Sequence, residues 1–262
     1  MLCPHSLCLF SYILNIIYMT KKTQGEFTVN TDEATAEALI HKEPIVAPGT
    51  MPVLIPFDAS RDNVQRLLLL LRSFVAFAKF GWHPVIIGDR PAEVSDEVPA
   101  IPFASEHRGI LGVAVTAVQS TEMTKEFIIA PLKTILNRPI LLAHCILPKR
   151  SSGGVDMRFP TVYDKSLLRQ AYDTTSQNGN MESTLFDTYF LECNVPPMLL
   201  DWRHDGILLP VVSERPSPDN VMRFLRVKAA IYVQHESAFE FLQGVLSRPL
   251  DDDRCRKFES EA

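Results

Sequence analysis

The residues PVLIPFDASRDNVQRLLLLLRSFVAFAKFGWHPVIIGD (52–89) carry the strongest structural signal of the chain. Two short apolar runs, Pro52–Asp58 and His83–Asp89, are typical of buried strands. Between them, apolar residues recur at helical spacing up to about Phe80, and Gly81 follows as a stop. The apolar face of this predicted helix consists of Leu67, Leu70, Leu71, Phe74, Phe77 and Ala78. A strand, a helix and a second strand in this order predict a βαβ unit and therefore a parallel sheet.

The residues that follow continue the alternation of strands and helices. Strands are expected at Val98–Phe103 and Phe127–Ala130, with a helix at Ile110–Ser120 between them. Further helices are expected at 165–175 and 180–194, and a late strand or turn followed by a helix at 232–244. We therefore predict a single Rossmann-like α/β domain over residues 51–250, with a mostly parallel central sheet flanked by helices. An N-terminal extension (1–50), with a helix at Thr31–His41, and a charged C-terminal tail (251–262) complete the expected organisation. The acidic run Leu250–Arg254 is expected to be solvated.

The composition argues against several classes of function for this chain. The chain has 262 residues, of which 46% are hydrophobic and 22% charged, as in ordinary globular proteins. A net charge of −5, with scattered lysines and arginines, argues against a nucleic-acid-binding surface. The five cysteines show no CxxC spacing, which argues against a zinc site or a disulfide framework.

The apolar stretch Leu7–Met19 is short for a membrane span, which needs about 20 residues. No basic residue precedes it, so it is also a poor signal peptide. We interpret residues 1–18 as an upstream extension from start-site choice, with a membrane anchor as the alternative. We expect a cytoplasmic protein without an integral membrane span.

Polar residues follow three of the expected strands, where open α/β sheets place their ligands. They are Ser60-Arg61-Asp62-Asn63, Gly88-Asp89-Arg90 and the Ala130-Pro131 loop. A loop that carries Arg61 at a helix start can hold a phosphate or a nucleotide. The alternative is that Ser60 or Asp62 caps the helix and that Arg61 is solvated.

The ordered set of these segments resembles bacterial and phage proteins related to the nucleotide-sugar glycosyltransferases of GT-A type, and more distantly the Stealth sugar-phosphate transferases. The matching segments run from Val53 to Glu259, and no single one of them is specific. They are Ser60-Arg61-Asp62-Asn63, Leu71-Arg72-Ser73, Gly88-Asp89-Arg90-Pro91, VPAIPF (98–103), VDMRFP (155–160), VYDK (162–165), STLFDTYF (183–190) and RKFE (256–259).

The chain departs from the family pattern at two places. The family has two adjacent aspartates after a strand, which hold a divalent metal ion, whereas this chain reads Ala130-Pro131-Leu132-Lys133-Thr134. The family's histidine in a Tyr-Asp-x-His segment is Arg158 here. Because Mg²⁺ and Mn²⁺ require hard oxygen ligands, we expect no divalent metal and no other cofactor.

The resemblance implies a nucleotide-sugar donor and a glycan acceptor, and it assigns the donor site to Ser60, Arg61, Asp62, Asn63, Arg72, Asp89 and Lys133. Lys133 and Arg158 would supply the positive charge that a metal ion provides elsewhere. The alternative is that another acid, such as Asp156 or Asp89, contributes to a rearranged site. Asp156 would act as a general base, the alternative being a turn cap, and Arg158 would bind phosphate unless it lies in a surface ion pair. Two functions stay open: an atypical, metal-independent glycosyltransferase, or a catalytically inactive GT-A-derived protein that binds a nucleotide or a glycan. An unrelated Rossmann-like hydrolase is a weaker third reading, because GxGxxG, P-loop and GxSxG motifs are all missing from the sequence.

Overall fold

The computed structural model describes residues 49–146, 149–151, 154–155, 157–176, 181–192, 198–199, 230–250 and 252–260. All of them belong to one unit, Pro44–Ala262. The extension before residue 49, including the expected helix Thr31–His41, lies outside the described residues, as does Asp156. Within the described part of the chain, no helix is both long and apolar enough to cross a membrane.

A five-stranded sheet in the order β3-β2-β1-β4-β8 forms the centre of the domain. Its first four strands are parallel, and β8 pairs antiparallel with β4. The prediction of a Rossmann-like α/β domain with a mostly parallel sheet flanked by helices is therefore confirmed. The strands are β1 (Met51–Phe57), β2 (Trp82–Gly88), β3 (Ala100–Ile101), β4 (Glu126–Ile129) and β8 (Thr161–Asp164).

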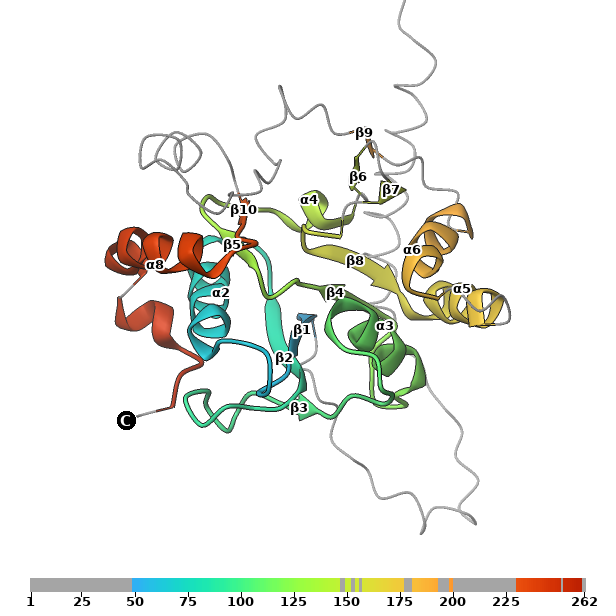
Figure 1. Ribbon diagram of the computed structural model, residues 1–262, viewed down its shortest axis with the longest axis horizontal. Coiled ribbons are helices and arrows are strands. Elements are labelled where there is room, and N and C mark those ends of the chain that lie inside the picture. Colours follow the sequence, from blue (N-terminus) through green and yellow to red (C-terminus); the bar gives the residue numbers. More distant parts are fainter. Residues whose placement is uncertain are drawn as a thin grey trace, which may run out of the picture. The chain divides into compact units, whose positions relative to one another are not determined.

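Helices cover both faces of this sheet, as Figure 1 shows. Alternate residues of β1 explain the arrangement: Val53 and Ile55 pack in the apolar cluster of α2 (Val64–Phe77), whereas Leu54 packs in that of α3 (Gly109–Gln119). Both clusters are formed largely by residues that are fully buried. The sheet thus has an apolar layer on each side, which is the pattern expected for parallel strands.

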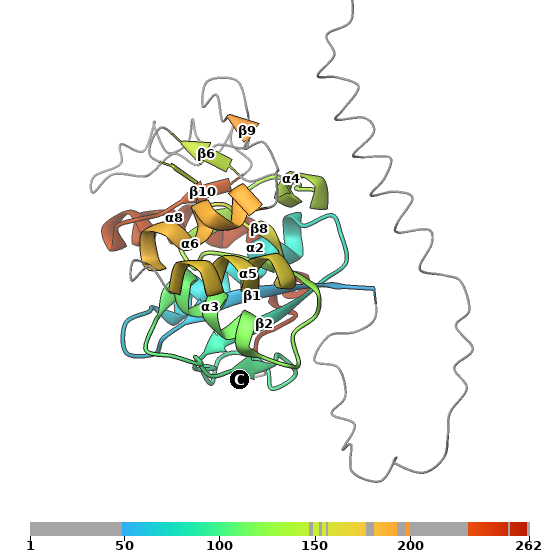
Figure 2. The ribbon, with the colours of Figure 1, turned by 90° about the vertical axis from the view of Figure 1, so that its right-hand side faces the viewer.

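The outer helices extend these two layers. Helix α8 (Glu236–Leu250) contacts α2 on one side of the sheet. On the other side, α5 (Lys165–Ser176) contacts α3 and lies beside α6 (Met181–Glu192), as both views show (Figures 1 and 2). The aromatic side chains of α6 surround the buried Tyr163 of β8, which anchors α6 to the sheet.

Two smaller sheets and two short helices complete the described fold. Strand β5 (Thr134–Leu136) pairs antiparallel with β10 (Ala230–Tyr232), so a late segment of the chain lies next to the loop after β4. The remaining elements are β6 (Lys149–Ser151), β7 (Gly154–Val155), β9 (Met198–Leu199), α4 (Leu142–Ile146) and the 3₁₀ helix η1 (Asp253–Arg256).

The start of α2 differs from the prediction. Asn63 caps the helix by accepting a hydrogen bond from the Gln65 amide at 2.9 Å, in place of Ser60 or Asp62. The reason lies in the preceding loop, where Ser60 and Asp62 both form hydrogen bonds with Asp58. The helix also ends at Phe77, three residues before the expected Phe80.

The C-terminal segment, expected as a charged tail, packs on the domain. Glu259 forms an ion pair with Arg72 of α2, and both side chains are only 17% exposed. The ring of Phe258 lies 5.3 Å from that of Trp82, and Ser260 donates hydrogen bonds to backbone carbonyls of the loop after β2. In the acidic run, Asp253 and Arg254 are exposed as expected, whereas Leu250 is buried.

Candidate functional site

The candidate site lies where the strand order of the sheet reverses. From β1 the chain passes through α2 to β2 and β3 on one side, and it returns through α3 to β4 on the other side of β1. The loops after β1 and β4 therefore leave neighbouring strands at the same edge, where open α/β sheets bind ligands. These loops carry Asp58–Asn63 and Pro131–Lys133, and Asp89 follows the adjacent β2.

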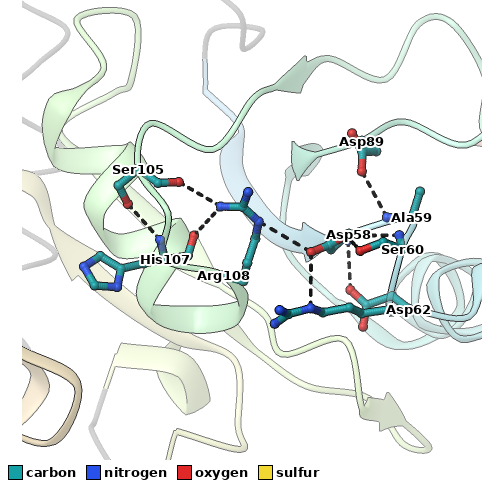
Figure 3. Close-up of polar contacts among 9 residues, drawn as sticks. Asp58, Ala59, Ser60, Asp62, Asp89, Ser105, His107 and Arg108 are labelled. Atoms are coloured by element: carbon teal, nitrogen blue, oxygen red, sulfur yellow. Dashed lines mark hydrogen bonds and ion pairs between the residues drawn. The ribbon is translucent and has the colours of Figure 1, made fainter.

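The loop after β1 is folded by its own carboxylates, as Figure 3 shows. Asp58 Oδ1 accepts hydrogen bonds from the Ser60 amide at 3.0 Å and the Ser60 hydroxyl at 2.6 Å. Asp62 Oδ2 accepts from the Asp58 amide at 2.9 Å, and Asp89 Oδ2 accepts from the Ala59 amide at 3.0 Å. Two acids of the loop itself and Asp89 from the loop after β2 thus hold the loop in shape.

The backbone amides of residues 58–62 already have acceptors. Those of Arg61 and Asp62 donate to the Asp58 carbonyl at 2.9 and 2.8 Å, and those of Gln65 and Arg66 donate to Asn63. A loop that holds phosphate through its backbone must instead direct free amides at the ligand. An anion bound against residues 58–62 would therefore be held by side chains.

Two arginines extend from this loop region. Arg61 Nε lies 3.9 Å from Asp58 Oδ2, and its side chain is 72% exposed. Arg108, the residue before α3, places its Nε 3.4 Å from the same oxygen and donates from Nη1 to the carbonyls of Ser105 and His107 (Figure 3). Its guanidinium also stands over the ring of Phe103, 4.9 Å from the centroid. Sequence analysis missed Arg108, for which the only signal is its place in the loop after β3.

The two acids of the loop differ in protonation behaviour. The hydroxyl of Ser60, followed by its amide, holds the pKa of Asp58 below its usual value. Burial raises the pKa of Asp62, although the Asp58 amide and the positive charges of Lys133 and Arg66 oppose this shift. The charge of Lys133 therefore acts on the β1 loop, which brings the loops after β1 and β4 into one electrostatic environment.

Lys133 occupies the loop that lacks the expected acids. Thr134 donates its amide to the Pro131 carbonyl at 3.0 Å, which closes a turn around Leu132 and Lys133. The Lys133 side chain is half-buried, and among the described residues its ammonium forms no hydrogen bond or ion pair. The charges of Asp62 and Glu236 act on this ammonium without forming an ion pair with it. A half-buried cation that forms no ion pair with the described residues is the feature that most strongly indicates an anionic ligand.

Arg158 is brought to the same loop. Its carbonyl accepts a hydrogen bond from the Thr134 hydroxyl at 2.6 Å, and its side chain is half-buried. The prediction that Lys133 and Arg158 belong to one site is thus compatible with their backbone positions. Asp156, expected as the general base, lies outside the described residues.

Two further donor-site residues, Asn63 and Arg72, bind acids from the C-terminal part of the chain. Asn63 donates from Nδ2 to Glu236 Oε1 at 2.7 Å in addition to capping α2. Arg72 lies further along α2 and forms two hydrogen bonds with Glu259, at 2.5 and 2.8 Å. The structure therefore brings Ser60, Arg61, Asp62, Asn63, Asp89 and Lys133 to one edge of the sheet, and it directs the Arg72 side chain to the C-terminal segment.

Sequence analysis also missed a buried arginine beside this site. Arg66 is 5% exposed and is bound to Glu236 at the start of α8, 170 residues further along the chain. No local pattern could have paired two residues so far apart. As for metal ligands, the described residues contain no group of three or more histidine, cysteine or acidic side chains that could hold an ion.

Comparison with known proteins supports no family assignment. No family model matches the chain, and no curated protein matches it. Among solved structures, it is similar to a 2-C-methyl-D-erythritol 4-phosphate cytidylyltransferase from Thermus thermophilus, with a TM-score of 0.44 and 13% sequence identity. That match covers 76% of this chain and 99% of the other.

Proposed function

We propose that this chain binds a nucleotide-activated sugar at the carboxyl edge of its parallel sheet and transfers the sugar without a divalent metal ion. The observation that carries the proposal is the half-buried ammonium of Lys133, which forms no hydrogen bond or ion pair with the described residues, although the charges of Asp62 and Glu236 act on it. The diphosphate of such a donor supplies the complementary negative charge. Arg61, exposed at the same edge, adds a second cation of the geometry that phosphate oxygens favour.

In the proposed reaction an acceptor hydroxyl attacks the anomeric carbon of the sugar. A new carbon–oxygen bond forms as the bond between the sugar and the diphosphate breaks, and the nucleoside diphosphate leaves. The hydroxyl proton passes to a carboxylate, for which Asp156 is the sequence-based candidate. Lys133, with Arg158 next to its loop, would stabilise the charge that develops on the leaving diphosphate.

Isothermal titration with UDP-, GDP- and CDP-sugars, each with and without Mn²⁺, tests the binding step. We expect one donor to bind independently of Mn²⁺, and Lys133→Ala to weaken it by about tenfold or more, because a hydrogen bond to a charged group contributes about 1.5–3 kcal/mol. Lys125→Ala is the matched control, since this exposed lysine precedes the same strand at its other end. Equal affinities of the two variants, or no binding by any donor, would refute the proposal.

The second candidate function is a catalytically inactive protein that binds a nucleotide or a glycan. It is favoured by the sequence of the β4 loop, in which Leu132 and Lys133 stand where the resembled family has its two metal-binding aspartates. A protein that binds the donor, and neither hydrolyses nor transfers the sugar to a panel of glycans, would support this candidate over the transferase.

A further inference from the structure

The N-terminal turns of α2 and α8 are joined by one carboxylate. Glu236 Oε1 accepts from Asn63 Nδ2 at 2.7 Å, while Oε2 accepts from Arg66 Nε at 3.0 Å and Nη2 at 2.8 Å. Although burial opposes it, these hydrogen bonds and the charges of Arg66 and Lys133 lower the pKa of Glu236, so it is ionised at neutral pH. Both carboxylate oxygens of Glu236 therefore accept hydrogen bonds from side chains at the start of α2.

Arg66 also donates hydrogen bonds to the backbone after β10. Its Nη1 donates to the Val233 carbonyl at 2.9 Å, and its Nη2 also reaches the His235 carbonyl at 3.3 Å. The guanidinium lies 4.4 Å from the ring centroid of Phe239. Because only 5% of Arg66 is exposed, it is too deeply buried to serve as a ligand contact of its own.

Val233 connects Arg66 to the loop that carries Lys133. Its amide donates to the Lys133 carbonyl at 2.8 Å, directly beyond the pairing of Tyr232 with Thr134 between β10 and β5. A continuous series of hydrogen bonds therefore runs from Glu236 through Arg66 and Val233 to the backbone of Lys133. These hydrogen bonds hold the loop after β4 against the segment that leads into α8.

We propose that Glu236 is a positioning residue which, through Arg66 and Val233, holds the Lys133 ammonium in place for a bound diphosphate. This inference rests on the proposed function for its ligand. Glu236 acts on the site without touching the ligand, and its role differs from that of the cations that meet the phosphate oxygens.

The direction in which Glu236→Gln changes the affinity for an anion distinguishes a positioning role from a purely electrostatic one. Glu236 is an anion close enough to Lys133 for the two charges to interact. If only charge mattered, Glu236→Gln would remove a repulsive group and tighten the binding of an anion. If Glu236 positions Lys133, the same change weakens binding, because glutamine has one acceptor oxygen for donors that now come from two side chains.

Glu259→Gln is the matched control. It removes a carboxylate that also binds an arginine of α2, but the pair that it breaks faces the C-terminal segment. Both variants lose one negative charge and one arginine–carboxylate pair. Only Glu236 is linked to the backbone of Lys133, so a difference between the variants reports that link.

The experiment combines UDP titration with amide hydrogen exchange at Val233 in the full chain. We expect Glu236→Gln to weaken UDP binding about threefold or more and to accelerate exchange at Val233 about tenfold, with Glu259→Gln unchanged in both. Unchanged or tighter UDP binding, or unchanged exchange at Val233, would overturn the positioning role. A wild-type protein that binds no UDP, GDP or CDP compound would refute the proposed function, while exchange at Val233 would still decide whether Glu236 fixes the Lys133 loop.

Discussion

Replacing Arg66 by methionine should destabilise the domain by about 2–4 kcal/mol. The largest contribution comes from the buried Val233 carbonyl, which loses its donor at a cost of about 1–3 kcal/mol. Loss of the contact between the guanidinium and Phe239 adds about 0.5–1 kcal/mol. Glu236 contributes little, because its side chain is 51% exposed and regains water. Methionine retains most of the aliphatic volume of arginine, so no large cavity adds to the cost.

Urea unfolding of the two proteins measures this difference, and thermal unfolding should show a decrease in Tm of about 5–15 °C. The wild-type advantage should also depend on pH. Since the pKa of Glu236 in the folded state lies below its ordinary value of 4.5, its contribution is present above that value and is lost as the pH falls through the folded pKa. A loss below about 1 kcal/mol at neutral pH would refute the reasoning, because it would mean that water replaces the guanidinium at the Val233 carbonyl.

Three further predictions concern the framework of the site. Gly88→Ala should destabilise the protein strongly in urea unfolding, because the φ of Gly88 is +119° and the added Cβ would lie 2.0 Å from a carbonyl oxygen of β1. Gly244 lies within α8, where an added Cβ meets nothing, so Gly244→Ala should stabilise the protein by about 0.5–1 kcal/mol. Equal effects of the two substitutions would contradict the geometry. Asp58→Asn should lower stability at pH 7, and the difference from wild type should shrink as the pH falls below 3.8, because the pKa of Asp58 is depressed in the folded state; a difference that persists at pH 2 would exclude this carboxylate as its source. Lys165→Met should reduce the Tm by a few degrees, since its ammonium donates to a carbonyl at the end of α3 at 2.5 Å. An unchanged Tm would show that the ammonium contributes nothing there.

The parallel sheet could be predicted because its signal is local. The apolar spacing of α2 and the two flanking apolar runs lie within residues 52–89, and they fix a βαβ unit without reference to the rest of the chain. The expected strand at 98–103 shrinks to Ala100–Ile101, because only these two residues pair with β2. Strand length depends on the neighbouring strand, which a single segment does not specify.

The contacts that tie the site together could not be predicted, because they join distant segments. Arg66 and Glu236, like Arg72 and Glu259, are ordinary charged residues in their local sequence. Ser60, Asp62 and Asn63 are all suitable helix caps, and the choice among them depends on which side chains Asp58 engages. The resemblance to glycosyltransferases placed Asn63 and Arg72 at a ligand, whereas their side chains have partners within the protein.

The acids of the β1 loop bind backbone amides of the same loop, and this limits how the loop can bind an anion. The amides of residues 58–62 donate to carboxylates or carbonyls of the loop and of Asp89, so they are not available to surround a phosphate group. Recognition by these five residues then depends on side chains, and Arg61 and Lys133 are the cations of the loops after β1 and β4. Arg61 is largely exposed, and its contribution should be screened by salt, whereas the half-buried Lys133 is screened less. The affinity for a diphosphate that survives high ionic strength should therefore depend on Lys133 and on the contacts that hold its loop in place.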